Sequence, residues 1–204
     1  RPIEELLETR EPQLLAGIIT DLRVINGQRG KLALFKLDDK SATIEARADE
    51  KLINEHKNLL KDDALIIAMG KAQPDRFSGG MQFTITQLWD LEQARCRFGR
   101  YLRVALKADG TSPGPDVAKL LREFPAQREM TDQGELVRGL LVRFALERLP
   151  GATLADAANP GAQAEEGAYA ELQLGDAARF YPSDAALARW RSQADAGRAV
   201  IAYE

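Results

Sequence analysis

The sequence has little of what catalysis or a membrane span would require. A single cysteine, Cys96, excludes an internal disulfide and fits the reducing cytoplasm. The only histidine, His56, stands between Glu55 and Lys57 and is interpreted as part of a solvated helix surface rather than as a catalytic base. No run approaches the roughly 18 apolar residues of a membrane helix, and no signal peptide is visible. We therefore expect a cytoplasmic protein with no membrane contact.

Positive charge is also scarce. The 204 residues carry a net charge of -3, whereas a protein that binds duplex DNA tightly is usually strongly basic. Any contact with nucleic acid must therefore come from a local patch of cations. The composition, 45% hydrophobic and 29% charged, is that of a folded globular protein.

The first half of the chain alternates apolar and polar residues over short runs, which predicts strands. Strands are predicted over 13–24, 31–37, 42–48, 64–70 and 81–86, and a helix over 49–60. Gly17 is expected to form a bulge or a sharp bend in the first strand, as barrel closure needs. Three strands, a helix and two further strands form the layout of an OB fold, a five-stranded β-barrel in which the helix closes one end.

The second half predicts a small mixed α/β domain. Strands are expected over 101–107, 139–148, 169–174, 179–181 and 198–203, and helices over 117–124 and 182–191. The composition of residues 150–167 is rich in Ala, Gly, Pro and acids and predicts a mobile loop. The expected organisation is a helix end and linker over 1–12, the OB domain over 13–98 and the α/β domain over 99–204.

An OB barrel usually binds single strands on its second and third strands, between two flanking loops. Cations there contact phosphates and aromatic side chains stack on bases. The candidates in this chain are the basic side chains of those strands and loops and one aromatic: Arg23, Arg29, Lys31, Lys36, Arg47, Lys71, Arg76 and Phe77. Phe77 is expected either to stack on a base or to pack on the barrel rim. Acids such as Asp38 and Glu45 dilute the patch, so binding should be weak and salt-sensitive.

The sequence offers no catalytic constellation. It has no cluster of metal-ligating residues, and Gly27 and Gly30 do not form a phosphate-binding loop. Asp38 and Asp39 are interpreted as a turn pair rather than as a two-metal site. The chain is therefore interpreted as a binding module without a catalytic site, a metal or a cofactor.

Three stretches, residues 16–46, 75–95 and 179–190, carry short signatures in a specific order. The signatures are Arg29-Gly30-Lys31, Leu37-Asp38-Asp39, Phe77-Ser78-Gly79-Gly80 and Pro182-Ser183-Asp184. With them the chain resembles the C-terminal region of the bacterial DNA polymerase III alpha subunit. The resemblance implies an OB domain that contacts single-stranded template DNA and a terminal domain that binds the tau subunit of the clamp loader in the replisome.

The same resemblance implies a parent enzyme, a DNA-directed DNA polymerase, whose catalytic carboxylates and internal clamp-binding peptide lie upstream of this chain. A start at Arg1 rather than at a methionine fits a fragment of a longer protein, with tag removal or processing as alternative explanations. Some family members end in a second clamp-binding peptide that contains a glutamine. Residues 198–203 lack it, so an ordinary edge strand is favoured there over a sliding-clamp contact.

Two alternatives stay open. The chain could be a protein-interaction scaffold whose OB domain does not bind nucleic acid, with Trp89, Trp190 or Tyr203 as anchors. It could also be the anticodon-binding OB domain of an aminoacyl-tRNA synthetase, which would prefer tRNA over DNA.

Overall fold

The computed structural model describes residues 2–8, 11–27, 30–75, 79–107, 114–148 and 168–203. The chain divides into two compact units, Arg1–Ala94 and Arg95–Glu204, and the division falls within helix α2 (Leu91–Phe98). None of the helices in these ranges is long and apolar enough to cross a membrane. The predicted mobile loop at 150–167 lies outside the described residues.

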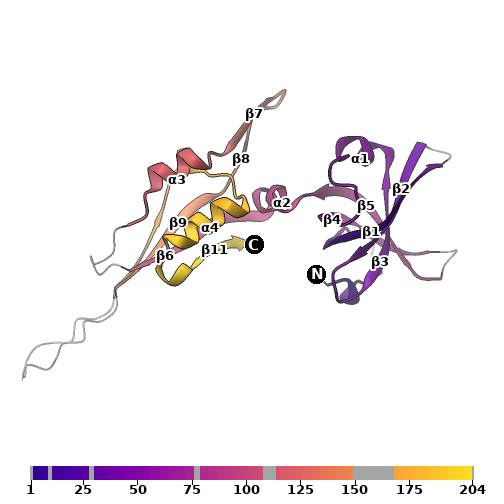
Figure 1. Cartoon of the computed structure of the whole chain (residues 1–204), viewed down its shortest axis with the longest axis horizontal. Coiled ribbons are helices and arrows are strands. Elements are labelled where there is room, and N and C mark those ends of the chain that lie inside the picture. The colour runs from indigo at the N-terminus through magenta and orange to yellow at the C-terminus, as the bar shows by residue number, and fades with distance from the viewer. Residues whose placement is uncertain are drawn as a thin grey trace, which may run out of the picture. The chain divides into compact units, whose positions relative to one another are not determined.

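The first unit is a closed barrel with the strand order β1-β2-β3-β5-β4 (Figure 1), which confirms the predicted OB fold. Its elements are β1 (Gln13–Gly27), β2 (Gly30–Asp38), β3 (Thr43–Asp49), α1 (Glu50–Glu55), β4 (Leu65–Pro74) and β5 (Met81–Trp89). Helix α1 begins where predicted, because the Asp49 carboxylate accepts the Leu52 N–H at 3.0 Å. It ends at Glu55, earlier than predicted, because the backbone leaves helical geometry at His56.

The barrel core follows the predicted alternation. Ile44, Ala46 and Ala48 are buried, and so is Phe35. The segment before β1, predicted as a helix end and linker, forms a 3-10 turn, η1 (Ile3–Glu5), and Ile3 is buried in the barrel core. Part of that segment therefore packs on the barrel.

Of the two predictions for Gly17, a bulge or a sharp bend, the bulge is wrong, because the bulge of β1 lies further along the strand. The pairing of β1 with β2 is regular through Thr20 and resumes at Arg23, so the extra residue lies at Asp21–Leu22. Asp21 has a φ of 57°, a left-handed conformation that Asp tolerates better than most residues. Gly17 is required for a different reason, because a Cβ there would lie 2.7 Å from Leu37 Cγ.

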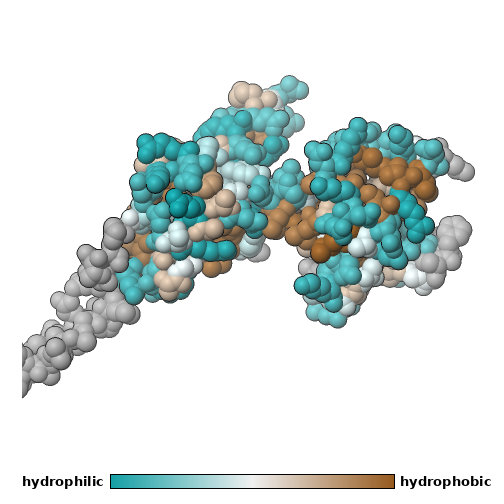
Figure 2. Space-filling model, viewed as in Figure 1, coloured by the Kyte–Doolittle hydropathy of each residue, from teal (hydrophilic) through white to brown (hydrophobic). Residues whose placement is uncertain are grey.

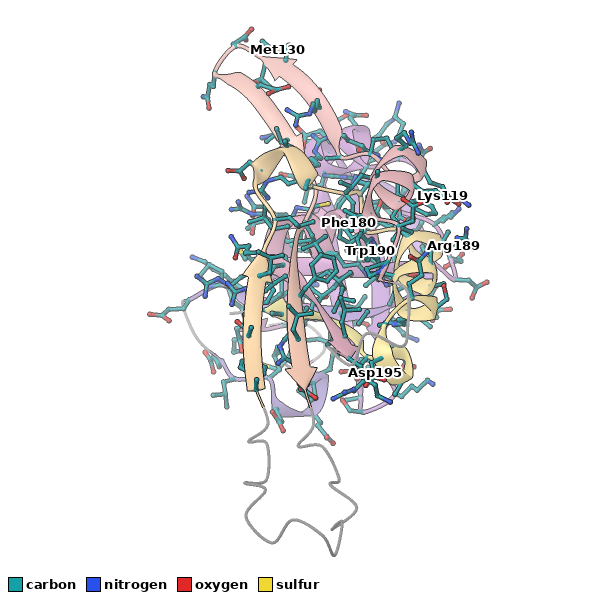
Figure 3. The ribbon with its side chains drawn as sticks, turned by 90° about the vertical axis from the view of Figure 1, so that its left-hand side faces the viewer. Lys119, Met130, Phe180, Arg189, Trp190 and Asp195 are labelled. Carbon is teal, nitrogen blue, oxygen red and sulfur yellow. The ribbon has the colours of Figure 1, made fainter. Side chains whose placement is uncertain are left out.

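The second unit is the predicted mixed α/β domain. Its sheet has the order β10-β9-β6-β11, and β6 and β9 are parallel. The strands are β6 (Gly99–Lys107), β9 (Leu141–Arg148), β10 (Ala168–Gln173) and β11 (Ala199–Tyr203). Helices α3 (Val117–Glu123) and α4 (Asp184–Ser192) pack their apolar residues on one face of this sheet. Phe180 and Trp190 lie beside each other in this core, with ring centroids 5.6 Å apart (Figure 3).

The structure differs from expectation at two places in this unit. Residues 127–138 form an unpredicted hairpin, β7 (Gln127–Thr131) and β8 (Gly134–Arg138), which extends away from the sheet (Figure 1). Residues 179–181 do not form a strand. Phe180 makes only isolated bridges to Pro125 and Leu140, because the segment changes partners at each residue and a ladder needs consecutive pairs.

The predicted edge strand at the end of the chain is confirmed, since β11 lies at the edge of the sheet.

Candidate nucleic-acid interface

A groove of about 220 Å³ lies on the outer face of the barrel, over the strands expected to bind nucleic acid. The residues that line this groove come from β1, β2, β3 and β5: Asp21, Arg23, Ile25, Leu34, Phe35, Lys36, Glu45, Ala46 and Gln82. A second hollow of about 380 Å³ lies between β2, β3, β5 and α1. Its lining includes Arg47, Thr84 and Thr86. The outer face therefore offers two adjacent hollows rather than a flat sheet.

Three cations lie in one row across this face, which we call the cation row: Arg23, Arg47 and Lys71. The register places Arg23 opposite Leu34 and Leu34 opposite Arg47. The row continues through Thr84, which is opposite both Arg47 and Lys71. Neighbouring strands are about 4.8 Å apart, so successive cations are separated by about 10 Å along the sheet. A chain of phosphates that crosses the strands would meet a cation on every second strand.

The bulge in β1 produces this row. Before the bulge, Leu15 and Ile19 point into the barrel, and uninterrupted alternation would point Arg23 inward as well. The extra residue at Asp21–Leu22 reverses the alternation, so Arg23 and Ile25 face outward while Leu22 packs against the core. A basic and an apolar side chain thereby reach the groove together.

The groove floor is aliphatic. Ile25 is 45% exposed, and Leu34, on the neighbouring strand, is half-buried. Figure 2 shows hydrophobic surface on the barrel near the β1–β2 hairpin, among hydrophilic patches. The only aromatic residue in the groove lining, Phe35, is buried in the core. Among the described residues, a base in the groove would therefore pack on branched aliphatic side chains.

One cation of the groove is neutralised. Lys36 Nζ lies 2.7 Å from the Asp21 carboxylate, and both side chains are about half exposed. The hydrogen bond from Lys36 and its positive charge lower the pKa of Asp21 below its ordinary value. Asp21 therefore stays ionised beside the groove, where it opposes the approach of a phosphate.

The cation row differs in its pairing from several arginines of the second unit. None of Arg23, Arg47 and Lys71 forms an ion pair within the part of the chain that the structure describes. Arginines of the second unit do pair with carboxylates, among them Arg103, Arg128, Arg138, Arg143, Arg179 and Arg198. A cation outside an ion pair keeps more of its charge available for a phosphate, although the positive charge of Arg23 also acts on the nearby Asp21 carboxylate and helps to lower its pKa.

The structure brings together four of the predicted site residues, Arg23, Lys36, Arg47 and Lys71, on one face. It does not bring Lys31 there, because Lys31 shares its side of the β1–β2 hairpin with Ala33 and not with Leu34. Arg29, Arg76 and Phe77 lie outside the described residues. The role of each as a nucleic-acid contact stays a prediction.

The candidates predicted from the sequence do not include three other residues of this face: Ile25, Leu34 and Thr84. A signal for Leu34 was present, since Leu32, Leu34 and Lys36 alternate with the core residues of β2. No signal marked Ile25, because its orientation depends on the bulge. Of the proposed protein anchors, Trp190 is fully buried and unavailable, whereas Tyr203 is 55% exposed.

The barrel agrees with the protein family that the chain matches. Residues 14–91 match a protein family described as an OB-fold nucleic acid binding domain. Among solved structures, a replication protein A heterotrimer bound to single-stranded DNA aligns with 71% of this chain and 31% of its own, at 15% identity and a TM-score of 0.37. A score this low supports no argument about function.

Sequence relatives give a more specific similarity. The DNA polymerase III subunit alpha of Pseudomonas aeruginosa is 37% identical over 108 residues, which cover 52% of this chain and 9% of that protein. The same subunit of Haemophilus influenzae is 26% identical over 137 residues, which cover 66% of this chain and 11% of that protein. The chain thus spans about a tenth of the relatives that it matches. Its homologues are DNA polymerase III alpha subunits, and the similarity lies over the OB-fold region and fits their C-terminal part.

Proposed function

We propose that this chain is the non-catalytic C-terminal region of a replicative DNA polymerase alpha subunit and that its barrel binds single-stranded template DNA. The observation that carries the proposal is the cation row beside an aliphatic groove on an OB barrel. The DNA polymerase activity of the parent protein and a cytoplasmic location belong to the same proposal, supported by the relatives that the chain matches.

The groove chemistry favours a single strand over a duplex. Unstacked bases can lie on Ile25 and Leu34 while their phosphates reach the row, whereas a duplex hides its bases in the stack. The net charge of -3 and the carboxylates of Asp21 and Glu45 limit the affinity. Binding should therefore be salt-dependent, with a slope of log K against log salt of about -2 when three phosphates are neutralised.

Anisotropy of a labelled oligothymidylate, titrated with the whole chain at low salt, tests this proposal. The double variant Arg23→Glu with Lys71→Glu should weaken binding at least about tenfold and reduce the salt slope to about -0.7, because one phosphate contact remains. The matched control is Lys119→Glu with Arg122→Glu on α3, which changes the net charge equally but lies in the second unit. Equal losses in both double variants would show that only net charge matters and would contradict the proposed site.

Competition with tRNA and with duplex DNA separates the alternatives. A preference for tRNA over single-stranded DNA would favour the anticodon-binding function. Absence of binding to every nucleic acid would favour the protein-interaction scaffold.

We further propose that the second unit binds the tau subunit of the clamp loader. The support is the likeness to polymerase alpha subunits, together with a sheet edge at β11 that carries the exposed Val200 and Tyr203. A pull-down of tau with the whole chain and with residues 91–204 tests this part. Capture by the whole chain but not by residues 91–204, if that piece is folded, would place the tau contact outside the second unit.

A further inference from the structure

Thr84 lies between two members of the cation row. Its strand, β5, runs between β3 and β4, and Thr84 is the register partner of both Arg47 and Lys71. Arg47 Nε donates a hydrogen bond to Thr84 Oγ1 at 2.8 Å, and Arg47 is half-buried. No other side-chain hydrogen bond of Arg47 is found with the described residues. The threonine hydroxyl is thus the group that restrains this guanidinium.

The hydrogen bond to Thr84 uses only Nε of Arg47, so the other nitrogens of the guanidinium can donate to a phosphate. Nε is occupied, while Nη1 and Nη2 keep the donors that a phosphate oxygen pair accepts. Arg128 in the β7–β8 hairpin is held differently, because its Nη1 lies 3.2 and 3.1 Å from the two carboxylate oxygens of Glu135. A carboxylate both orients and neutralises an arginine, whereas a neutral hydroxyl orients it and leaves its charge available.

Space for the ligand lies beside this pair. Arg47 and Thr84 both line the second hollow of about 380 Å³, together with Lys51, the apolar Leu32 and Ile85, and the carboxylates of Asp49 and Glu55. A phosphate that enters this hollow would meet the Arg47 guanidinium and the Lys51 ammonium, while the two carboxylates limit the affinity. Lys71, on the other side of Thr84, would then meet the same single strand.

From this geometry we propose that Thr84 is a positioning residue for DNA binding: it holds Arg47 in the conformation that contacts a phosphate of the single strand. The proposal rests on the proposed function and adds to it a residue that does not itself carry charge. Holding a flexible arginine in place before binding avoids the loss of side-chain freedom on binding, an effect of about three- to tenfold in affinity.

The test uses the isosteric variant Thr84→Val, which removes the hydroxyl, and Thr84→Ser, which keeps it, in the whole chain. The control is Thr131→Val in the β7–β8 hairpin, because the Thr131 hydroxyl donates to the carbonyl of Gly134, holds no cation and lines neither hollow. Thr84→Val should weaken binding to labelled oligothymidylate about three- to tenfold. Thr84→Ser and Thr131→Val should bind within about twofold of the wild type, as substitutions outside the contact do.

A double-mutant cycle separates positioning from a structural role. In an Arg47→Ala background, Thr84→Val should have no further effect on affinity, because the group that Thr84 positions is gone. An equal effect of Thr84→Val with and without Arg47 would overturn the proposal, and so would unchanged affinity in the single variant. The thermal midpoint of each variant, compared with those of the wild type and of Thr131→Val, detects a general loss of structure.

Failure of the proposed DNA-binding function can be distinguished from failure of the positioning role of Thr84. If the wild-type chain binds no single-stranded DNA, the proposed function fails, and the free protein still tests the restraint on Arg47. The Nε–Hε resonance of Arg47 should be resolved in the wild type and lost to exchange in Thr84→Val but not in Thr131→Val. A resonance that is unchanged in Thr84→Val would overturn the positioning role independently of DNA.

Discussion

Asp21 is a single residue with two opposing effects on the barrel face. It occupies the bulge that turns Arg23 outward, and its carboxylate pairs with Lys36. The first effect depends on the backbone at a φ of 57°, which Asn adopts as readily as Asp. The second depends on the negative charge alone. The two effects can therefore be separated by one substitution.

Asp21→Asn should strengthen binding to single-stranded DNA about two- to fivefold at low salt, because it frees Lys36 and removes a charge that repels phosphate. Anisotropy titration measures the change. Glu129→Gln is the control, since it frees Arg138 from a 3.0 Å ion pair in the second unit and should leave DNA affinity unchanged. Weaker binding by Asp21→Asn would show that the carboxylate matters for the shape of the face rather than for its charge.

Asp39 fixes the turn between β2 and β3. Burial raises the pKa of its carboxyl, but hydrogen bonds from the Ser41 hydroxyl and from the backbone N–H groups of Ile3, Ala42 and Ser41 outweigh burial and lower the pKa to about 2. A pKa below the ordinary 3.8 means that folding favours the ionised form. Its stabilising contribution is complete above pH 3.8 and is lost as the pH falls towards 2.

Asp39→Asn should therefore lower the free energy of unfolding by about 1 kcal/mol at pH 7, a value reduced for the partial exposure of the site. The difference from the wild type should fall to about half near pH 3. Urea denaturation at pH 7, 5 and 3 measures it. Asp132→Asn, in the exposed turn between β7 and β8, is the control for the substitution itself. A difference that stays constant down to pH 3 would rule out the ionised carboxylate as its cause.

At the scale of the element, helix α4 begins at a capping residue that the sequence shows and carries side chains of the hydrophobic core of the second unit. Ser183 Oγ accepts the N–H of Ala186 at 3.1 Å and caps the helix, as the Pro-Ser-Asp start indicates. The helix then places Leu187 and Trp190 in the core of the second unit, and Trp190 is fully buried. The cap therefore stabilises the element that carries the largest core side chain.

Ser183→Ala should lower the free energy of unfolding by about 1 kcal/mol, the usual cost of losing a helix cap. Ser192→Ala provides the comparison, because the Ser192 hydroxyl donates to the carbonyl of Arg189 at the other end of the same helix. Its effect should stay within about 0.5 kcal/mol. Urea denaturation followed by circular dichroism measures both. Equal effects would mean that the serine at the start of α4 acts only through helix propensity.

At the scale of the whole molecule, the chain has two separate hydrophobic cores. Among the described residues, the core of the first unit consists of side chains between Ile3 and Leu88. The core of the second unit consists of side chains between Leu102 and Ile201. Helix α2 contributes Arg95 to the second unit. This side chain is 12% exposed, pairs with Asp184 at 2.7 Å and donates to the carbonyl of Pro182 at 3.0 Å.

Residues 1–90 and 91–204, produced as separate chains, should each fold. Their amide NMR spectra should superimpose on the spectrum of the whole chain away from the cut. A piece that begins at Gly99 loses Arg95 and should be less stable than 91–204 by about 1–3 kcal/mol, since a hydrogen-bonded charge pair is removed. An unfolded 91–204 piece would contradict the assignment of one independent core to each unit.

Much of the barrel could be predicted because its information is local. The period-two alternation of β3, the Asp49 cap and the polar turn at Asp38 and Asp39 each depend on residues that are close in sequence. The β7–β8 hairpin could not be predicted in the same way, because all its residues but one are exposed and it has no buried face to impose alternation. Its one local mark is Gly134, which has a φ of 116° after the turn.

The sequence by itself determined that five strands and a helix form a barrel with cations on its surface. Only the tertiary structure decided which cations lie together. A bulge of one residue reverses every side chain after it, and the pairing of strands far apart in the chain places Arg23, Arg47 and Lys71 in one row. Alternation along a strand is a local property, whereas register and bulge position depend on how the closed barrel fits all five strands at once.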